Sequence, residues 1–384
     1  MFKKQIQVLT IVLMAFLSSC VDGDLGPLNR FDDQPDAIVY DWSGVSDSLQ
    51  NATYNTYLTS GGTYRENNTG NERFHYWWNA HMLDVLVDGY IRTNDESYLP
   101  KMKALLQGIR SKNGNTYVNV FNDDMQWLGI SALRAYQATG DEEYRTVGRF
   151  LWEENKKSWS DVLGGGITWK SDEPLGKNAC SNGPAAILAC LMYQVDGQQD
   201  DLDWAIQIFN WLKNTLVDPQ TGLVWDNVEL VNNEPVFNRD WIFTYNQGSF
   251  IGAATLLYQL TGENTYLQDA IRTANTSSTS SQVTTQGLLR DEGQGDGGLF
   301  KGIFVRYYSW LILTEGLSES DRNRYVAFMK FNAETFSSLG LKRPEMIASP
   351  NWRQQPGEVI DLATQLSGVM LVETASVLQK EELL

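Results

Sequence analysis

Residues 260–267 read Leu-Thr-Gly-Glu-Asn-Thr-Tyr-Leu, a short polar turn that separates two apolar runs. Related turns stand at 92–99 and 138–144, and a weaker copy stands at 195–197. A glycine after a helix is a C-cap signal, and an acidic residue directly after it favours the start of the next helix. Each copy of the turn therefore predicts a helix hairpin.

The runs before these turns carry apolar residues at helical spacing, as at Leu128, Ala132, Leu133 and Tyr136. Strand-like alternation is scarce, and no βαβ rhythm is present. The hairpins recur at roughly 45 to 65 residues, so about six of them fill the chain. The sequence predicts an all-α fold, an (α/α)6 barrel of six inner and six outer helices, because a closed ring needs no capping repeats. Periodicity alone also fits an open superhelix.

The N-terminus has the features of an export signal. Lys3 and Lys4 precede an apolar run over residues 8–17, and Leu-Ser-Ser-Cys ends at Cys20. These four residues resemble a bacterial lipobox, although an ordinary cleaved signal also fits. We expect a lipoprotein signal peptide over 1–19, a lipidated Cys20 with a flexible tether over 20–36, and one domain over 37–384. Such a protein belongs to the bacterial cell envelope, lipid-anchored at the outer membrane and facing the periplasm or the outside.

The charge of the chain argues against anionic partners. Lys and Arg number 30 against 47 Asp and Glu, which gives a net charge of −17. This balance disfavours nucleic acid and anionic membrane surfaces, so membrane contact is expected only through the lipid anchor. We expect a monomer that binds a neutral partner. Cys180 and Cys190, ten residues apart in an apolar run, predict small buried thiols rather than a disulfide.

The pair Asp123-Asp124 stands where an apolar helix begins and Trp127 follows. Two close carboxyl groups cannot both ionise freely, and glycoside hydrolysis needs one protonated and one charged carboxyl. On spacing alone, helix capping explains the pair better, because acids suit a first helical turn. Neighbours at a helix end favour the separation of about 5–5.5 Å used by retaining glycosidases. Since a helix N-terminus lowers a carboxyl pKa, burial against Trp127 and the neighbouring charge must raise it.

Three long connections, at 159–182, 237–247 and 291–306, mix Gly, Trp and Asn with single charges. Loops of this content carry function more often than they merely connect, and we expect them at one mouth of the barrel. The chain has 13 Trp and 17 Tyr. Aromatic platforms beside polar side chains suit a sugar cleft, as at Trp127, Trp169, Trp241 and Tyr245. Core packing explains any one of them better, and the cleft interpretation depends on the set.

Other chemistries fit the sequence poorly. Only His75 and His81 are present, without a nucleophile-elbow motif, so a Ser-His-Asp site has little support. No phosphate-binding glycine loop occurs. The stretch 291–296 departs from a calcium loop because glycine occupies ligand positions, and it is typical of a flexible turn. We expect no metal and no cofactor.

Five sequence elements, in order, resemble those of glycoside hydrolase family 76, the endo-α-1,6-mannanases. They are Asn-Asp-Asp-Met at 122–125 with Trp127, Gly-Gly-Ile-Thr-Trp at 165–169, Lys-Asn-Ala at 177–179 with Ser-Asn-Gly at 181–183, Tyr-Asn-Gln-Gly at 245–248, and Phe-Lys-Gly-Ile-Phe at 300–304 with Arg-Tyr at 306–307. The resemblance covers about residues 75 to 310. It implies an (α/α)6 barrel, a retaining mechanism without metal, and the α-1,6-linked mannose backbone of yeast and fungal mannan as substrate.

By this resemblance Asp123 is the nucleophile and Asp124 the general acid/base. The predicted sugar-binding residues are Trp127, Trp169, Asn182, Tyr245, Asn246, Gln247, Lys301 and Arg306. Lys301 and Arg306 fit structural ion pairs equally well. The alternatives are a non-catalytic surface glycan-binding lipoprotein, a different (α/α)-barrel glycosidase or lyase, and transglycosylation, to which fungal members of the family point.

Overall fold

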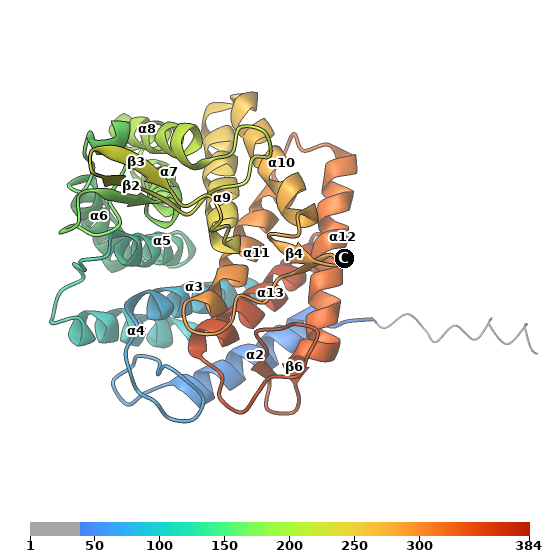
Figure 1. The fold of residues 1–384 in the computed structure, drawn as a ribbon. Coiled ribbons are helices and arrows are strands. Elements are labelled where there is room, and N and C mark those ends of the chain that lie inside the picture. The colour runs from blue at the N-terminus through green and yellow to red at the C-terminus, as the bar shows by residue number, and fades with distance from the viewer. Residues whose placement is uncertain (1–38) are drawn as a thin grey trace, which may run out of the picture. The chain divides into compact units, whose positions relative to one another are not determined.

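The computed structural model describes residues 39–384; the predicted signal peptide, Cys20 and the tether lie outside the described residues. Trp42–Leu384 forms one compact unit with twelve α-helices. In Figure 1 the helices follow one another in colour order around a common centre, and the red α13 returns beside the blue α2. The prediction of an (α/α)6 barrel is confirmed.

Six helices form the inner ring, and each packs against the next, with α13 closing the ring on α3. The inner helices are α3 (Tyr76–Thr93), α5 (Asn122–Thr139), α7 (Ala179–Asp196), α9 (Thr244–Thr261), α11 (Gly297–Leu313) and α13 (Leu362–Lys380). The outer helices are α2 (Trp42–Tyr57), α4 (Tyr98–Lys112), α6 (Glu142–Lys156), α8 (Gln199–Leu216), α10 (Asn264–Thr279) and α12 (Glu319–Thr335). Inner and outer helices alternate along the chain.

Burial separates the two rings. Helix α9 is buried on every side along its first fourteen residues, whereas α6 buries only one stripe, which includes Tyr144, Val147, Leu151 and Trp152. A helix that is apolar all round must lie in a core, and an amphipathic one covers it. The inner helices also approach closely: a Cβ added at Gly248 of α9 would lie 2.5 Å from the Cα of Phe304 in α11. A side chain at this position would force α9 and α11 apart.

The repeated turns end the inner helices as predicted. Gly140, Gly197 and Gly262 are the C-caps of α5, α7 and α9, with φ of 72°, 65° and 73° in the left-handed region. Asn94 takes the same place after α3. Only residues without a Cβ penalty, or Asn, adopt this conformation routinely. After the turn at 140, the Asp141 carboxylate accepts a hydrogen bond from the backbone N–H of Glu143 and starts α6.

Short strands, which the sequence did not predict, lie in the long connections. An antiparallel sheet joins β1 (Gly176–Asn178), β2 (Asn227–Val231) and β3 (Glu234–Phe237), with Lys177 opposite Val228. Two hairpins join β4 (Thr284–Thr285) to β5 (Leu288–Leu289), and β6 (Leu341–Lys342) to β7 (Ile347–Ala348). A 3-10 turn (Val162–Gly164) and a π turn (Phe336–Gly340) complete the described elements. The long connections therefore contain regular secondary structure.

An amide side chain at the fourth position of four inner helices holds the loop that precedes each helix. The four residues are Asn79 in α3, Asn182 in α7, Gln247 in α9 and Gln365 in α13. The Asn182 Oδ1 accepts from the N–H of Ile167 at 2.8 Å, and its Nδ2 donates to the same residue's C=O at 2.9 Å. Gln247 pairs in the same way with Val224. These amides act like a strand partner for an otherwise unpaired loop backbone.

Asn182→Ala is expected to lower the free energy of unfolding by roughly 2–3 kcal/mol, because the buried amide and carbonyl of Ile167 lose their partners. Denaturant unfolding measures this loss. The matched control is Gln137→Ala, which removes an exposed amide that bonds only Gln194. Its effect should stay within about 0.5 kcal/mol. A loss equal to the control would contradict a clamping role for Asn182.

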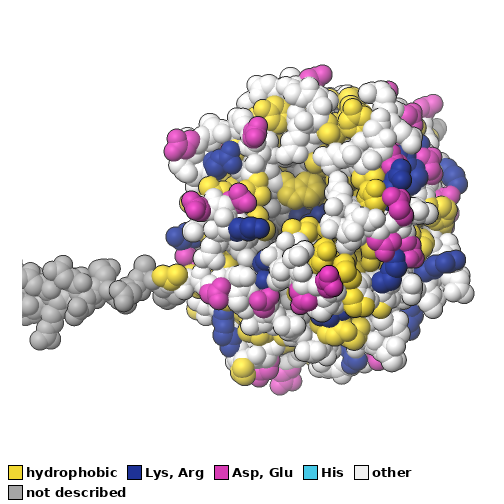
Figure 2. All heavy atoms as spheres, turned by 180° about the vertical axis from the view of Figure 1, so that it is seen from behind, with side chains coloured by type: hydrophobic (Ala, Val, Ile, Leu, Met, Phe, Trp, Pro, Cys, Tyr) yellow, Lys and Arg dark blue, Asp and Glu magenta, His cyan; other side chains and the backbone are white. Residues whose placement is uncertain are grey.

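Three further observations concern membranes, metal ions and surface charge. Within residues 39–384 no helix is both long and apolar enough to cross a membrane. The same residues hold no group of three or more His, Cys, Asp or Glu side chains arranged for a metal ion. On the face drawn in Figure 2, Lys and Arg side chains are interspersed with Asp and Glu and form no continuous basic surface.

Candidate active site

A cavity of about 1060 Å³ opens where the inner helices α3, α5, α7, α9 and α11 begin. The loops at 169–178, 226–229 and 241–243 complete its wall. Its lining includes Tyr76, Trp77, Asp123, Asp124, Trp127, Trp169, Cys180, Asp226, Trp241, Tyr245, Asp296 and Phe300. All three long connections contribute to the wall, so they gather at one mouth of the barrel as predicted.

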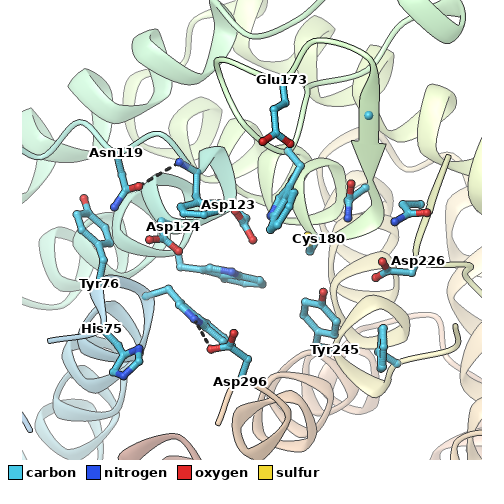
Figure 3. A pocket seen from close by; sticks show the side chains of 18 of the residues that line it. His75, Tyr76, Asn119, Asp123, Asp124, Glu173, Cys180, Asp226, Tyr245 and Asp296 are labelled. Atoms are coloured by element: carbon cyan, nitrogen blue, oxygen red, sulfur yellow. Dashed lines mark hydrogen bonds between the residues drawn. The ribbon is translucent and has the colours of Figure 1, made fainter. Parts of the chain in front are cut away.

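Asp123 and Asp124 lie in the first turn of α5, partly exposed to this cavity (Figure 3). The helix start is anchored by Asn122, whose backbone N–H and side-chain Nδ2 donate to the carbonyls of Trp169 and Thr168, each at 2.9 Å. This contact also brings Trp169 to the acids. The N-cap residue is Phe121, which has no side chain for capping. The pair is therefore presented to the cavity by the helix end.

Burial raises the pKa of Asp123 to about 7. Hydrogen bonds from the Cys180 thiol, from the backbone N–H groups of Asp123 and Asp124, and from Trp169 act in the opposite direction without cancelling it. Those bonds favour the charged form of Asp123. A carboxyl with this balance ionises near neutral pH while its neighbour keeps a proton.

The pKa of Asp124 is raised well above its ordinary value, first by burial, then by the charges of Asp123 and Asp296. The sequence left open whether burial or the helix N-terminus would dominate. Burial and like charge dominate here. Two adjacent carboxyl groups thus share a site in which one is held protonated, as acid/base chemistry requires.

Cys180, Asp226 and Tyr245 stand near Asp123 on the cavity wall (Figure 3). Burial raises the pKa of the Asp226 carboxyl to about 6, while a hydrogen bond from Asn246 Nδ2 at 2.9 Å lowers it. The Cys180 thiol bonds both Asp123 and Tyr245, and burial raises its pKa well above the ordinary value. Sequence reasoning missed Asp226 and the position of Cys180, because neither stands in a charged or repeated motif.

Aromatic rings wall the cavity on two sides. Phe121 and Trp169 lie 5.1 Å apart between ring centroids on one side. On the other, Tyr245 and Phe300 stack at 3.9 Å, and Trp77 lies 6.3 Å from Phe300. Flat rings of this kind suit the C–H faces of sugars. Trp127 is 2% exposed and packs on His81, so it forms the floor of the cavity.

Five of the predicted sugar-binding residues do not line the cavity, which corrects the expectation for them. Asn182, Asn246 and Gln247 are fully buried, the first and third in loop clamps and the second behind Asp226. Lys301 donates to the Pro350 carbonyl and lies over the ring of Trp352. Arg306 pairs with Asp84 and Asp88. These groups support the wall from behind or hold the barrel core. The structure brings Trp127, Trp169 and Tyr245 together with the acids.

The raised pKa values predict a pH-dependent cost in stability. A carboxyl whose folded pKa exceeds its unfolded value binds protons more tightly in the native state, so stability falls as pH rises between the two values. Asp124→Asn removes this cost. The variant should gain free energy of unfolding near pH 8, and little near pH 3, where both states are protonated. Denaturant unfolding across that pH range measures it. A gain of equal size at every pH would contradict the assignment.

Comparison with known proteins places the chain in a family. Residues 43–384 match the family model of Glycosyl hydrolase family 76. The structure of an α-1,6-mannanase from Salegentibacter sp. HEL1_6 is similar, with a TM-score of 0.87 and 58% sequence identity, over 88% of this chain and 100% of that one. An inactive variant of that enzyme, in which two adjacent aspartates are replaced by asparagine, matches equally well and is in complex with α-1,6-mannotriose.

A curated relative is more distant. The mannan endo-1,6-alpha-mannosidase DCW1 of Candida glabrata is 26% identical over 210 residues, which are 50% of this chain and 47% of that protein. The match therefore spans about half the length of this relative. The match over 43–384, which contains the barrel and both acids, decides the assignment: the chain belongs to glycosyl hydrolase family 76.

Proposed function

We propose that this protein is a retaining, endo-acting α-1,6-mannanase that hydrolyses the α-1,6-mannose backbone of yeast or fungal mannan. The observation that carries the proposal is the Asp123-Asp124 pair, with raised pKa values, in a cavity between aromatic walls. The cavity is open to solvent and lies among loops, which suits entry of a chain at an internal bond.

In the proposed mechanism, Asp123 attacks the anomeric carbon of the mannose bound beside it. The glycosidic C–O bond breaks, and the proton of Asp124 moves to the leaving oxygen. A glycosyl ester on Asp123 results. Water then attacks the same carbon, gives a proton to Asp124, and frees Asp123 as a carboxylate. The anomeric configuration is kept because the carbon is inverted twice.

The choice of substrate is supported by the relatives. The enzyme from Salegentibacter is an α-1,6-mannanase, and an inactive variant of it carries two changed adjacent aspartates. In this chain, Asp123-Asp124 is the adjacent aspartate pair that lines the cavity. The aromatic walls around it, with Trp169 and Tyr245, are proposed to contact the sugar rings.

The direct test is incubation with debranched yeast mannan. The wild-type protein should release oligosaccharides of several lengths from the start, and NMR should detect the α-anomer of each new reducing end first. A screen of plant and bacterial glycans separates this activity from that of another (α/α)-barrel glycosidase or lyase. Tight mannan binding without cleavage would favour the glycan-binding lipoprotein instead. Disaccharide products alone would contradict the endo mode.

The location is a separate proposal. Leu-Ser-Ser-Cys ending at Cys20 supports a lipid anchor in a bacterial envelope, with the enzyme acting as a monomer on a polymer outside the cytoplasm. Labelling cells with a radioactive or clickable fatty acid should mark the protein. Cys20→Ser should abolish the label and release the protein from the membrane fraction. An unlabelled wild-type protein would show that the segment is an ordinary signal.

A further inference from the structure

The loop 291–296 was predicted to be a flexible turn. Its last residue, Asp296, lines the cavity. Asp296 is the residue directly before α11, the N-cap position. An aspartate in this position normally accepts hydrogen bonds from the first-turn amides of its helix. The Asp296 side chain makes no such bond. The carboxylate instead accepts hydrogen bonds from side chains of α3.

Asp296 holds two indoles of α3. Its Oδ1 accepts from Trp77 Nε1 at 3.0 Å and from Trp78 Nε1 at 2.9 Å. Trp77 belongs to the cavity wall, while Trp78 is buried and stacks on His75 at 3.8 Å. The loop is fixed on its other side, because the N–H of Gly295 donates to Asp361 at 2.8 Å. One oxygen therefore ties the start of α11 to the start of α3 across the mouth of the cavity.

Asp296 lines the same cavity as Asp124, and it is solvent-exposed there. A negative charge near a second carboxyl disfavours the ionisation of that carboxyl. The charge of Asp296 accordingly raises the pKa of Asp124, after burial and Asp123. Asp296 also lies near His75, whose pKa is lowered by burial.

We propose that Asp296 is a positioning residue for the reaction: it fixes the indoles of Trp77 and Trp78 and keeps Asp124 in the protonated form that the leaving oxygen needs. The inference rests on the proposed function, since it assigns Asp124 as the acid. It adds a third carboxylate, outside the adjacent pair, to the set that controls the reaction.

Other groups around Asp124 do not replace this effect. Asp123 of α5 also carries a like charge, but it is unchanged in the Asp296→Asn variant. Tyr76 of α3 faces Asp124, and burial keeps its pKa well above 10, so it remains neutral. The remaining titratable groups of the lining are His75 of α3, Lys112 at the end of α4, Cys180 of α7, Asp226 and Glu229 beside β1, Tyr245 of α9, and Asp172 and Glu173 in the loop before β1.

The test is the pH profile of kcat/KM for Asp296→Asn. The amide oxygen of Asn can still accept from both indoles, but the charge is gone. The alkaline limb, which reports loss of the proton from the Asp123-Asp124 pair, should move to lower pH, because a negative charge that disfavoured ionisation of Asp124 has been removed. The acid limb should move less. KM at the optimum should stay close to the wild-type value.

Two variants complete the design. Asp296→Ala removes both charge and acceptor, so the same shift of the limb should come with a rise in KM, because Trp77 is no longer held. Asp291→Asn is the matched control: it changes an exposed aspartate of the same loop that bonds only the Gly293 N–H and does not line the cavity. It should leave both limbs in place.

Carbon-13 NMR of aspartate-labelled protein reads the ionisation of Asp124 without any catalysis, with Asp124→Asn for assignment. This readout separates the inference from the proposed function, because an inactive wild type would refute the mannanase and leave the titration measurable. An unmoved Asp124 titration and alkaline limb in Asp296→Asn would overturn the inference. An equal shift in Asp291→Asn would also overturn the inference, because any loss of one negative charge from the protein would then produce the shift.

Discussion

Asp123→Asn is expected to lower kcat/KM on α-1,6-mannan by at least about a thousandfold, because an amide cannot form the glycosyl ester. Asp124→Asn should cost about 100- to 10,000-fold, the contribution of a positioned general acid/base. Reducing-end assays on mannan oligosaccharides measure both. The adjacent pair at the start of α8 supplies the matched control. Asp200 is largely exposed at the molecular surface and pairs only with Lys156 at 3.5 Å, so Asp200→Asn should keep wild-type rates.

The separate roles of the two acids can be distinguished with azide and an aryl α-1,6-mannobioside whose leaving group needs no protonation. Asp124→Asn should form the glycosyl ester on this substrate at a rate near that of wild type, then stall. Azide should restore turnover and give the α-azide, since the second step no longer needs a base. Asp123→Asn should give the β-azide, because azide then replaces the nucleophile. The opposite pairing of products would reverse the assignment.

The turns at 140, 197 and 262 made the barrel predictable from sequence. A glycine with positive φ ends each of these helices, and at 140 and 262 an acid follows it directly. Such a cap is a local signal that does not depend on the rest of the fold. The short strands escaped prediction for the opposite reason. Strand β1 spans only three residues and pairs with β2 about fifty residues later, so its existence depends on contacts that no local window contains.

Two pairs of adjacent aspartates show that this motif alone does not predict a catalytic site. Asp200-Asp201 and Asp123-Asp124 are both adjacent acids in a first helical turn. Asp201 is fully buried on Arg149 and Trp152 and serves the packing of two outer helices. The second pair begins an inner helix and opens into the cavity. Spacing cannot separate these outcomes, because the difference is the ring to which the helix belongs.

Two of the five residues wrongly predicted to bind sugar share one explanation. Asn182 and Gln247 stand in motifs next to the cavity, and amides are suited equally to sugar hydroxyls and to backbone groups. Their position decides: each is the fourth residue of an inner helix, as are Asn79 and Gln365. The recurrence of an amide at the fourth position of these helices was visible in the sequence, and it indicates a structural role. Asp296 had no such repeat, and only the fold brings it to Trp77.

Arg306→Met is expected to lower the free energy of unfolding by about 3–5 kcal/mol, because it leaves two buried acids with only one of their two cationic partners. Arg306 of α11 makes two hydrogen bonds to Asp88, at 2.8 and 2.6 Å, and its Nε forms an ion pair with an Asp84 carboxylate oxygen 2.9 Å away. Arg134 of α5 is the second cation of this core cluster. With Arg306 gone, two carboxylates of α3 face one guanidinium in a water-poor interior.

The loss should depend on pH in a defined direction. Burial alone would raise the pKa of Asp88, but Arg306 and Arg134 lower it below its ordinary value. A depressed carboxyl pKa stabilises the native state above the unfolded value of about 3.9, and this contribution is lost as pH falls. The difference in free energy of unfolding between wild type and Arg306→Met should therefore be largest at neutral pH and should decrease below about pH 4. Urea unfolding at several pH values measures it.

Arg324→Met is the matched control, since Arg324 is 47% exposed and pairs with Asp321 one helical turn away. A surface pair of this kind contributes at most about 1 kcal/mol. If Arg306 held sugar, as its motif suggested, Arg306→Met would raise KM while leaving stability near that of the control. Its position between α11 and α3, behind the cavity wall, requires the reverse: a large loss of stability and an unchanged KM at temperatures where the variant is folded.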